Sequence, residues 1–115
     1  MKKEIRVYLE DILESIEKIE EYTHDRNFEE FTKNTERQDA VIRRLEIMGE
    51  AVKNLPGDLK EKYTTIPWRQ IAGMRDMLIH EYAGVSLGPV WKVVIDDLKP
   101  LKKIIVEMLD ELPRE

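Results

Sequence analysis

Apolar residues recur every three or four positions along most of this chain, with charged residues between them. That spacing places the apolar side chains on one face of an α-helix. Over the first segment it predicts an amphipathic helix spanning roughly residues 2–23. The apolar positions of this helix are Ile5, Tyr8, Leu9, Ile12, Leu13, Ile16 and Ile19.

Two shorter segments and one long one follow the first helix. After the polar break HDRN, the sequence FEEFTK predicts a short helix or turn, and the next apolar stripe predicts a helix from about Glu36 to Asn54. The sequence LPG ends that helix, because Pro56 restricts the residue before it and Gly57 relaxes the backbone. A short helical stretch is expected at Leu59–Tyr63.

The C-terminal half predicts two more helices. Pro67 suits a first helical turn, so the next helix is expected from Pro67 to about Tyr82, with Gly84 as its stop. The last helix, near Leu87–Leu112, has apolar residues close to heptad spacing, and Pro100 is expected to bend it.

No segment has the alternating pattern of a β-strand, and no linker or internal repeat divides the chain. The expected architecture is therefore all-α: one domain over residues 1–115, an up-down bundle of four main helices with additional short helices. The wide apolar faces and the heptad stripe of the last helix favour a homodimer.

Composition narrows the class of protein further. The chain is 42% hydrophobic and 37% charged, the balance of a helix-rich soluble protein, and it has no cysteine for a disulfide or a thiolate zinc site. Acids interrupt the apolar residues of the N-terminus, and no window approaches a membrane span, so a cytoplasmic location is expected. The net charge of −5 argues against nonspecific binding to the nucleic-acid backbone, but it is compatible with local basic patches.

The stretch RDMLIHEY, residues 75–82, places three chemically capable side chains close together: Arg75, His80 and Tyr82. Arg75 lies on the apolar side of the predicted helix, where an arginine requires either a partner carboxylate or an anionic ligand. At about 100° per residue, His80 is turned by about 140° from Arg75. Either the helix ends before His80, or a second protomer completes the site. Asp76, one turn before His80, can accept a hydrogen bond from the imidazole.

Residue types alone do not decide what this cluster does. A lone histidine in a helix is more often structural than catalytic, and Tyr82 is most simply an aromatic residue at the edge of the core with its hydroxyl in water. On spacing and composition, the chain is a helical bundle with one polar cluster.

The arrangement of Arg75, His80 and Tyr82 matches the motif Rx4HxY, and here the chain resembles the HEPN superfamily, specifically the HepT-type toxins paired with minimal nucleotidyltransferases. The resemblance covers most of the chain. It extends over the blocks RLEIMGEAVKNLP, IPWRQIAGMRDMLIHEY and PVWKVVIDDLKPLKKI, in the expected order and spacing.

The resemblance implies an all-α homodimer whose motif lines a cleft at the interface. It also implies a metal-independent endoribonuclease without a cofactor, the toxin of a toxin–antitoxin pair whose antitoxin is a minimal nucleotidyltransferase. His80 would be the general base or acid, and Arg75 would stabilise charge on the phosphate, giving a cyclic phosphate product. Tyr82 would receive AMP groups from the nucleotidyltransferase; the alternative is that it positions the substrate.

Other basic and aromatic residues are candidates for supporting roles. Arg69 is the strongest of them, because it turns toward the side of the helix that carries Asp76 and His80. The remaining cations that can flank a cleft are Arg43, Arg44 and Lys53, and a solvated helix face is the simpler explanation for each of these basic residues, Arg69 included. Trp68 and Trp91 are expected to be packing anchors, and His24 a surface residue.

Two readings compete with an RNA-cleaving toxin. One is a binding or regulatory subunit of a nucleotidyltransferase complex that keeps the bundle and cleaves nothing, which the acidic charge favours slightly. The other is a purely structural helical dimer, which leaves the grouping of Arg75, His80 and Tyr82 unexplained.

Overall fold

A computed structural model describes the backbone of residues 2–80 and 87–113, and the side chains of residues 5–74 and 87–113. Within these ranges the chain is helical and contains no strand, as the sequence predicts. The helices are α1 (Lys2–Thr23), α2 (Phe28–Thr32), α3 (Thr35–Lys53), α4 (Gly57–Glu61), α5 (Trp68–His80), α6 (Leu87–Lys92), the π-helical segment η2 (Val93–Asp97) and α7 (Leu98–Glu111).

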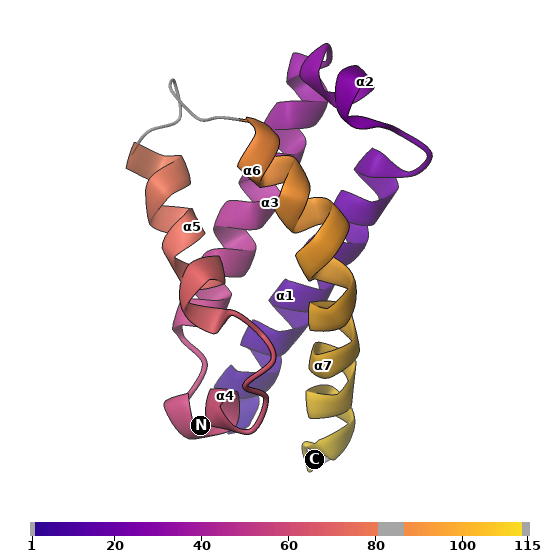
Figure 1. The fold of residues 1–115 in the computed structure, drawn as a ribbon. Helices are drawn as coiled ribbons and strands as arrows, with labels where there is room; N and C mark the ends of the chain where they lie inside the picture. Colours follow the sequence, from indigo (N-terminus) through magenta and orange to yellow (C-terminus); the bar gives the residue numbers. More distant parts are fainter. Residues whose placement is uncertain (1, 81–86, 114–115) are drawn as a thin grey trace.

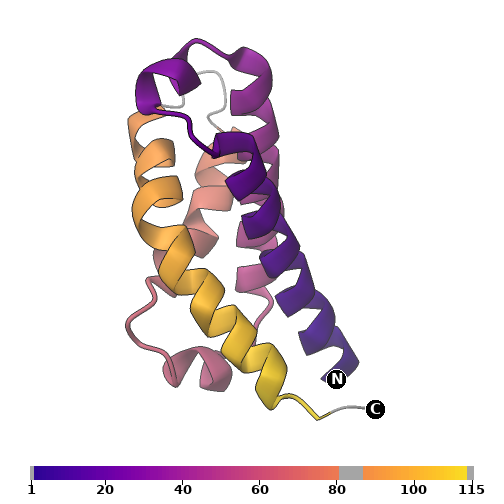
Figure 2. The same ribbon diagram turned by 90° about the vertical axis from the view of Figure 1, so that its right-hand side faces the viewer.

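The long helices run alternately up and down (Figure 1). α1 and α5 run away from the end of the molecule that holds both termini, whereas α3 and the α6–α7 segment run back toward it, as Figures 1 and 2 both show. α3 packs against α1 on one side and against α5 on the other, and α1 also packs against α7. The predicted up-down bundle with additional short helices is therefore confirmed.

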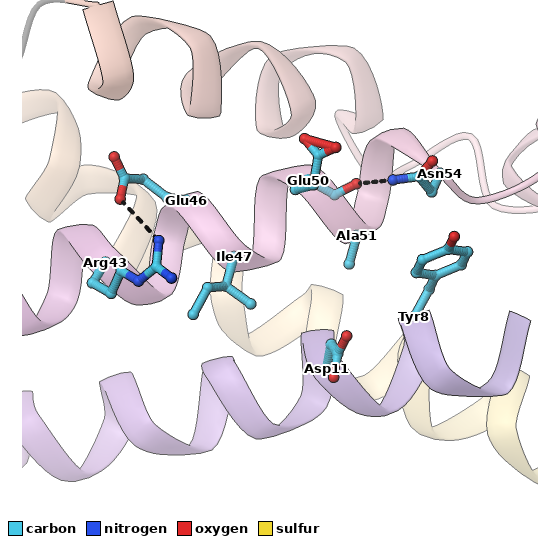
Figure 3. Close-up of a pocket in the computed structure, with 8 residues that line it drawn as sticks. All are labelled: Tyr8, Asp11, Arg43, Glu46, Ile47, Glu50, Ala51 and Asn54. Carbon is cyan, nitrogen blue, oxygen red and sulfur yellow. Dashed lines mark hydrogen bonds and ion pairs between the residues drawn. The ribbon is translucent and has the colours of Figure 1, made fainter. Parts of the chain in front are cut away.

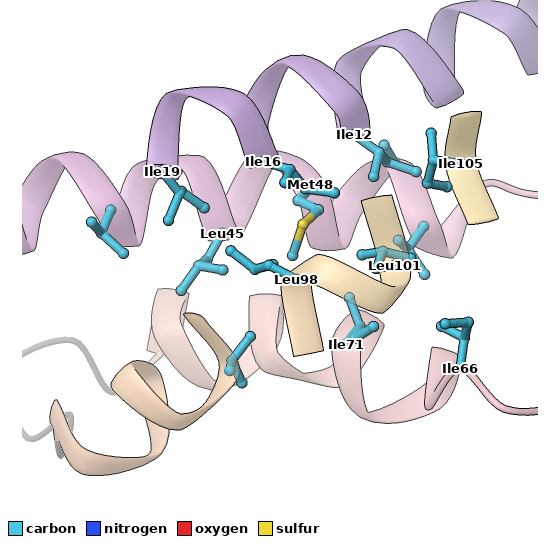
Figure 4. Packing of buried hydrophobic residues seen from close by; sticks show 14 of the residues in the cluster. Ile12, Ile16, Ile19, Leu45, Met48, Ile66, Ile71, Leu98, Leu101 and Ile105 are labelled. Atoms are coloured by element: carbon cyan, nitrogen blue, oxygen red, sulfur yellow. The ribbon is translucent and has the colours of Figure 1, made fainter. Parts of the chain in front are cut away.

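The core lies where the four long segments meet (Figure 4). Ile12 and Ile16 of α1, Met48 of α3, Ile71 of α5 and Leu101 of α7 are all buried in one cluster. The helix spacing read from the sequence places these residues on inward faces, so burial of the apolar stripes is the main source of stability.

Four apolar side chains of the last helix, at heptad-like spacing, are buried in this core. Leu98, Leu101, Ile105 and Met108 are each no more than 2% exposed. These four side chains are covered within one chain, so they lend no support to a homodimer, which stays a prediction.

A π-helical segment precedes Pro100. The N–H of Leu98 donates to the carbonyl of Val93, five residues back, instead of the usual four. Proline has no N–H, and its ring collides with the carbonyl four residues earlier, here that of Asp96. The wider turn relieves this conflict. Figure 2 shows the axis changing direction where α6 passes into α7, so the bend expected at Pro100 is confirmed.

Asparagines begin two of the helices. The Asn27 side chain accepts from the N–H of Glu30 at 2.8 Å, and the Glu30 carboxylate accepts from the N–H of Asn27 at 3.0 Å, which is a capping box. The Asn34 side chain begins α3 with a single cap, because it accepts from the N–H of Arg37 at 2.9 Å. The prediction for the next short helix was wrong at its start, because α4 begins at Gly57, directly after Pro56, and Gly57 has no positive φ.

Candidate active site

Trp68 fixes the start of α5, the helix that carries the motif. Its indole N–H donates to the backbone carbonyls of Lys60 at 3.1 Å and Tyr63 at 3.0 Å, so it ties α5 to the end of α4. Ile66 and Ile71 on either side are each 4% exposed. The prediction that Trp68 is a packing anchor is confirmed, and the first turns of α5 are held by buried contacts.

Three of the predicted site residues lie in the last two turns of α5. The helix continues without a break from Trp68 to His80 and so includes Arg75, Asp76 and His80. The side chains of these three residues, and the whole of Tyr82, lie outside the described residues. The hydrogen bond from His80 to Asp76 and the role of Tyr82 therefore stay predictions.

The continuity of α5 excludes one of the two explanations for the geometry of Arg75 and His80. A helix that ended before His80 would free the imidazole to turn toward the arginine, but α5 reaches His80. On a regular helix the two positions differ by about 140° around the axis and by about 7.5 Å along it. The explanation in which the helix ends before His80 is therefore wrong, and the explanation in which a second protomer completes the site stays a prediction.

Arg69 lines an open cleft at the other end of α5. The cleft has a volume of about 520 Å³ and lies where the α4–α5 connection meets the first turn of α5. Arg69 and Lys60 bring two cations to it. The Lys60 ammonium also donates to the carbonyl of Val52 at the end of α3, at 3.4 Å. Its remaining lining residues are Glu61, Thr64, Ile66, Pro67, Trp68 and Gln70.

The arginines of α3 are balanced by carboxylates within the chain. Arg44 Nη1 lies 3.3 Å from Glu14 Oε1 of α1, and Arg43 Nη1 lies 3.8 Å from Glu46 Oε1. Lys53 is exposed in the last turn of α3. A carboxylate therefore offsets part of the charge of Arg43 and of Arg44, and the supporting role of Arg69 stays a prediction.

The other two residues singled out from the sequence have ordinary structural roles. The ring of Trp91 lies 5.0 Å from that of Phe31, between centroids, and packs against the core. The His24 side chain is 80% exposed and its Nε2 lies 3.2 Å from Asp25 Oδ2. Trp91 as an anchor and His24 as a surface residue are both confirmed.

A second cleft, which sequence reasoning missed, lies between α1 and α3 (Figure 3). Its volume is about 280 Å³, and its residues are Tyr8, Asp11, Arg43, Glu46, Ile47, Glu50, Ala51 and Asn54. Because it depends on how two helices separated by a loop align, no single-helix pattern reveals it. Three carboxylates against one guanidinium make it unsuited to RNA phosphate.

Two ionisable groups away from the motif have shifted pKa values. The hydroxyl of Tyr63 donates to Glu111 Oε1 at 3.0 Å, and this hydrogen bond raises the pKa of Tyr63 above its ordinary value. The Lys102 ammonium donates to Glu20 Oε1 at 2.8 Å, which raises the pKa of Lys102. Both contacts join α7 to other parts of the bundle and are structural.

Within the side chains that the structure describes, no three His, Asp or Glu residues are placed to hold a metal ion. Among the described helices, none combines the length and the apolar character needed to cross a membrane.

The fold and the α5 motif define a small all-α protein with an arginine and a histidine on one helix. Residues 12–108 match the family model "Ribonuclease HepT-like", so the chain belongs to the HepT-like ribonuclease family. The resemblance seen in the sequence is thereby confirmed. No solved structure matches the chain significantly.

The chain is similar to several proteins that are named as ribonucleases. The chain is 52% identical to the "Probable ribonuclease HepT" of Thermococcus cleftensis, over 89% of this chain and 93% of the relative. It is 45% identical to a "Putative RNase" of Methanocaldococcus jannaschii, over 96% of this chain and 94% of the relative. A third relative, the "Gamma-glutamylcyclotransferase and putative RNase" of the same organism, is 52% identical over 99% of this chain, which spans only 51% of that longer protein.

Proposed function

We propose that this chain is an endoribonuclease that cleaves RNA without a metal ion, with His80 and Arg75 as its catalytic residues. Membership of the HepT-like ribonuclease family is the observation that carries the proposal. Relatives named as RNases, aligned over most of both chains, support it. The presence of Arg75, His80 and Tyr82 at the motif spacing adds to that support.

The chemistry needs one proton acceptor, one proton donor and one cation. The His80 imidazole takes the proton of a ribose 2′-hydroxyl, and the 2′-oxygen forms a bond to the adjacent phosphorus. The bond from phosphorus to the 5′-oxygen breaks, that oxygen takes up a proton from solvent, and His80 returns to solvent the proton that it took. Arg75 stabilises the charge on the phosphoryl oxygens in the transition state. The products are a 2′,3′-cyclic phosphate and a 5′-hydroxyl.

The active form is a homodimer in which each site combines Arg75 of one protomer with His80 of the other. The continuous helix from Trp68 to His80 supports this arrangement, since it turns the two positions about 140° apart in one chain. Two-fold dimers are the commonest oligomers, and a two-fold axis beside α5 would create two equivalent sites.

The partner is a minimal nucleotidyltransferase that acts as antitoxin by transferring AMP to the hydroxyl of Tyr82. The oxygen of Tyr82 attacks the α-phosphorus of ATP, and pyrophosphate leaves. An added phosphate next to Arg75 occupies the anion site and repels an RNA backbone, so modification switches the ribonuclease off. The toxin and its antitoxin then form one regulatory module.

Cleavage of a labelled single-stranded RNA pool in EDTA tests the proposal. We expect wild-type protein to cut, His80→Ala to lose at least about a hundredfold in rate, and His24→Ala to cut normally. His24 is a matched control because it is the other histidine of the chain, lies outside α5, and has a side chain that is 80% exposed. Circular dichroism confirms that each variant is folded.

A non-catalytic regulatory subunit is the second candidate, and the net charge of −5 favours it. It predicts that unmodified wild-type protein, verified by intact mass to carry no AMP on Tyr82, binds a nucleotidyltransferase but cuts no RNA.

A further inference from the structure

The outward face of α7 carries a row of four exposed side chains. Residues 99, 103, 106 and 110 recur at steps of four, three and four, so on this helix they share one face. They are Lys99, Lys103, Val106 and Asp110; each is exposed, Val106 by 40%. The opposite face of α7 packs into the core, and α1 lies beside the helix (Figure 2). We call these four residues the α7 outer stripe.

The charges of α7 are separated by sign along the helix. Its three lysines all lie among residues 98–103, and its three acids all lie among residues 107–111. An acid in the last turn of a helix is unfavourable, because the last carbonyls carry partial negative charge, and α7 has no base there. The hydroxyl of Tyr63 donates to Glu111 at 3.0 Å. Asp110 makes no ion pair or hydrogen bond through its side chain with a described residue, so nothing in the described chain offsets its charge.

The two lysines of the outer stripe also lack an ion pair among the described residues. Lys102, on the flank toward α1, donates to Glu20 at 2.8 Å, but Lys99 and Lys103 make no such contact. Lys103 and Glu107 are four residues apart, in the order lysine then acid, which is the weaker order for such a pair on a helix. The outer stripe therefore has bases at one end and an acid at the other, with little compensation inside one chain.

We propose that the α7 outer stripe binds the outer stripe of a second copy of this chain, with the two α7 helices antiparallel about a two-fold axis. The positions 99 and 110, and the positions 103 and 106, have the same midpoint between residues 104 and 105. In an antiparallel pair each Lys99 therefore faces the partner's Asp110, and the apolar stem of each Lys103 covers the partner's Val106. Steps of four and three are the spacing of a two-helix seam, and a two-fold interface must be self-complementary in this way.

The charges of this face favour a second copy over RNA or a lipid surface. Glu107 and Asp110 offset Lys99 and Lys103, so the face offers a polyanion no net positive charge. Val106 is the one large apolar side chain of the stripe, which is too little to insert into a membrane. Charges of opposite sign at the two ends attract an antiparallel copy of the same helix.

The contact is small, and it lies away from the motif. The 14 residues of α7 extend about 21 Å, so the seam is smaller than a standard interface, and we expect a Kd on the order of 0.1 mM. Because α7 does not carry Arg75 or His80, this contact is separate from the dimer of the proposed function. Joined through α7, two such dimers form an assembly of four chains.

Disulfide trapping tests the pairing directly, because the chain has no cysteine of its own. Equal amounts of a Lys99→Cys chain and an Asp110→Cys chain are oxidised together at about 0.1 mM, and the linked dimers are identified by mass. Random collisions give about half mixed dimers, whereas the antiparallel seam should give at least about nine tenths, since it brings only positions 99 and 110 together. Lys99→Cys with Lys53→Cys is the matched control, because Lys53 is an exposed lysine of α3, and it should give the random share.

Charge reversal and its rescue provide a second measurement, made by sedimentation equilibrium at low salt. Lys99→Asp and Asp110→Lys should each raise the Kd of this contact by about tenfold, because the two-fold axis repeats the new repulsion twice. The double variant Lys99→Asp/Asp110→Lys should return to the wild-type Kd, since it exchanges the two charges. Lys53→Asp makes the same change of charge outside the stripe and should leave the Kd unchanged.

The outcomes are independent of RNA cleavage. Mixed disulfides at the random share, or a double variant that associates no better than the single ones, would show that the α7 outer stripe does not pair with itself. A wild-type mass that stays constant up to about 1 mM would also contradict the inference. Either result leaves the proposed ribonuclease untouched, because its test is the cutting of RNA by wild type and by His80→Ala.

Discussion

Mixing two inactive variants would show whether the catalytic pair comes from one chain or from two. The perturbations are Arg75→Ala and His80→Ala, each made in a separate chain. On one α5 the two positions differ by about 140° around a helix that is roughly 10 Å wide with its side chains, and by about 7.5 Å along it. The two positions of a regular helix therefore face different directions, and we expect one chain's α5 not to bring both groups to the same phosphate.

The arithmetic of mixed dimers sets the expected activity. After the two variants are unfolded together in equal amounts and refolded, about half of the dimers contain one chain of each kind. In each mixed dimer one site pairs an intact Arg75 with an intact His80, and the other site lacks both. We therefore expect about a quarter of the wild-type rate of RNA cleavage from two proteins that are each inactive.

A second mixture provides the control. Wild type refolded with the double variant Arg75→Ala/His80→Ala should keep about a quarter of the activity if sites are shared between chains, and about half if each chain has its own complete site. Wild type alone, taken through the same cycle, corrects for refolding losses. No recovery in the first mixture together with half retention in the second would refute the reasoning from helix geometry.

Three further predictions concern stability and titration. Ser15→Ala should stabilise the fold by about 1 kcal/mol in urea unfolding, because Ser15 is fully buried and its hydroxyl has no hydrogen-bond partner among the described residues; a loss of stability would contradict this. Phe31→Ala should cost about 3–5 kcal/mol, since Phe31 is 0% exposed and stacks against Trp91, and a cost below about 1 kcal/mol would show that this contact adds little. Glu111→Gln should lower the pKa of Tyr63 toward its ordinary value of 10.0, measured by phenolate absorbance. The raised pKa implies that the stability from this contact is present below about pH 10 and lost as the pH rises through the folded-state pKa; an unchanged titration in Glu111→Gln would count against the contact.

The helices themselves follow from the sequence because helical periodicity is a local property. The apolar spacing in α1 and in α7 predicts the buried faces, and Pro100 predicts the bend. The π-helical segment that makes the bend was not predicted. A helix can relieve the steric conflict around a proline by several different local changes of backbone geometry. The early start of α4 at Gly57 was missed because glycine and proline usually mark a break.

Contacts between helices account for most of what the sequence could not show. The pairing of Arg44 with Glu14 joins residues 30 positions apart, and it places a carboxylate beside one of the predicted supporting cations. The acidic cleft between α1 and α3 likewise depends on the alignment of two helices. The divergence of Arg75 and His80, by contrast, was predictable, because it depends only on the step of a single helix.

The chemical identity of the new RNA ends tests the central claim most directly. In this experiment, single-stranded RNA is incubated with wild-type protein in EDTA, and any fragments are analysed by mass spectrometry. A histidine-centred, metal-free mechanism at His80 predicts fragments ending in a 2′,3′-cyclic phosphate or its hydrolysed form, with a 5′-hydroxyl on the other fragment. Fragments with 3′-hydroxyl and 5′-phosphate ends, or cleavage that occurs only when a divalent metal is added, would contradict it.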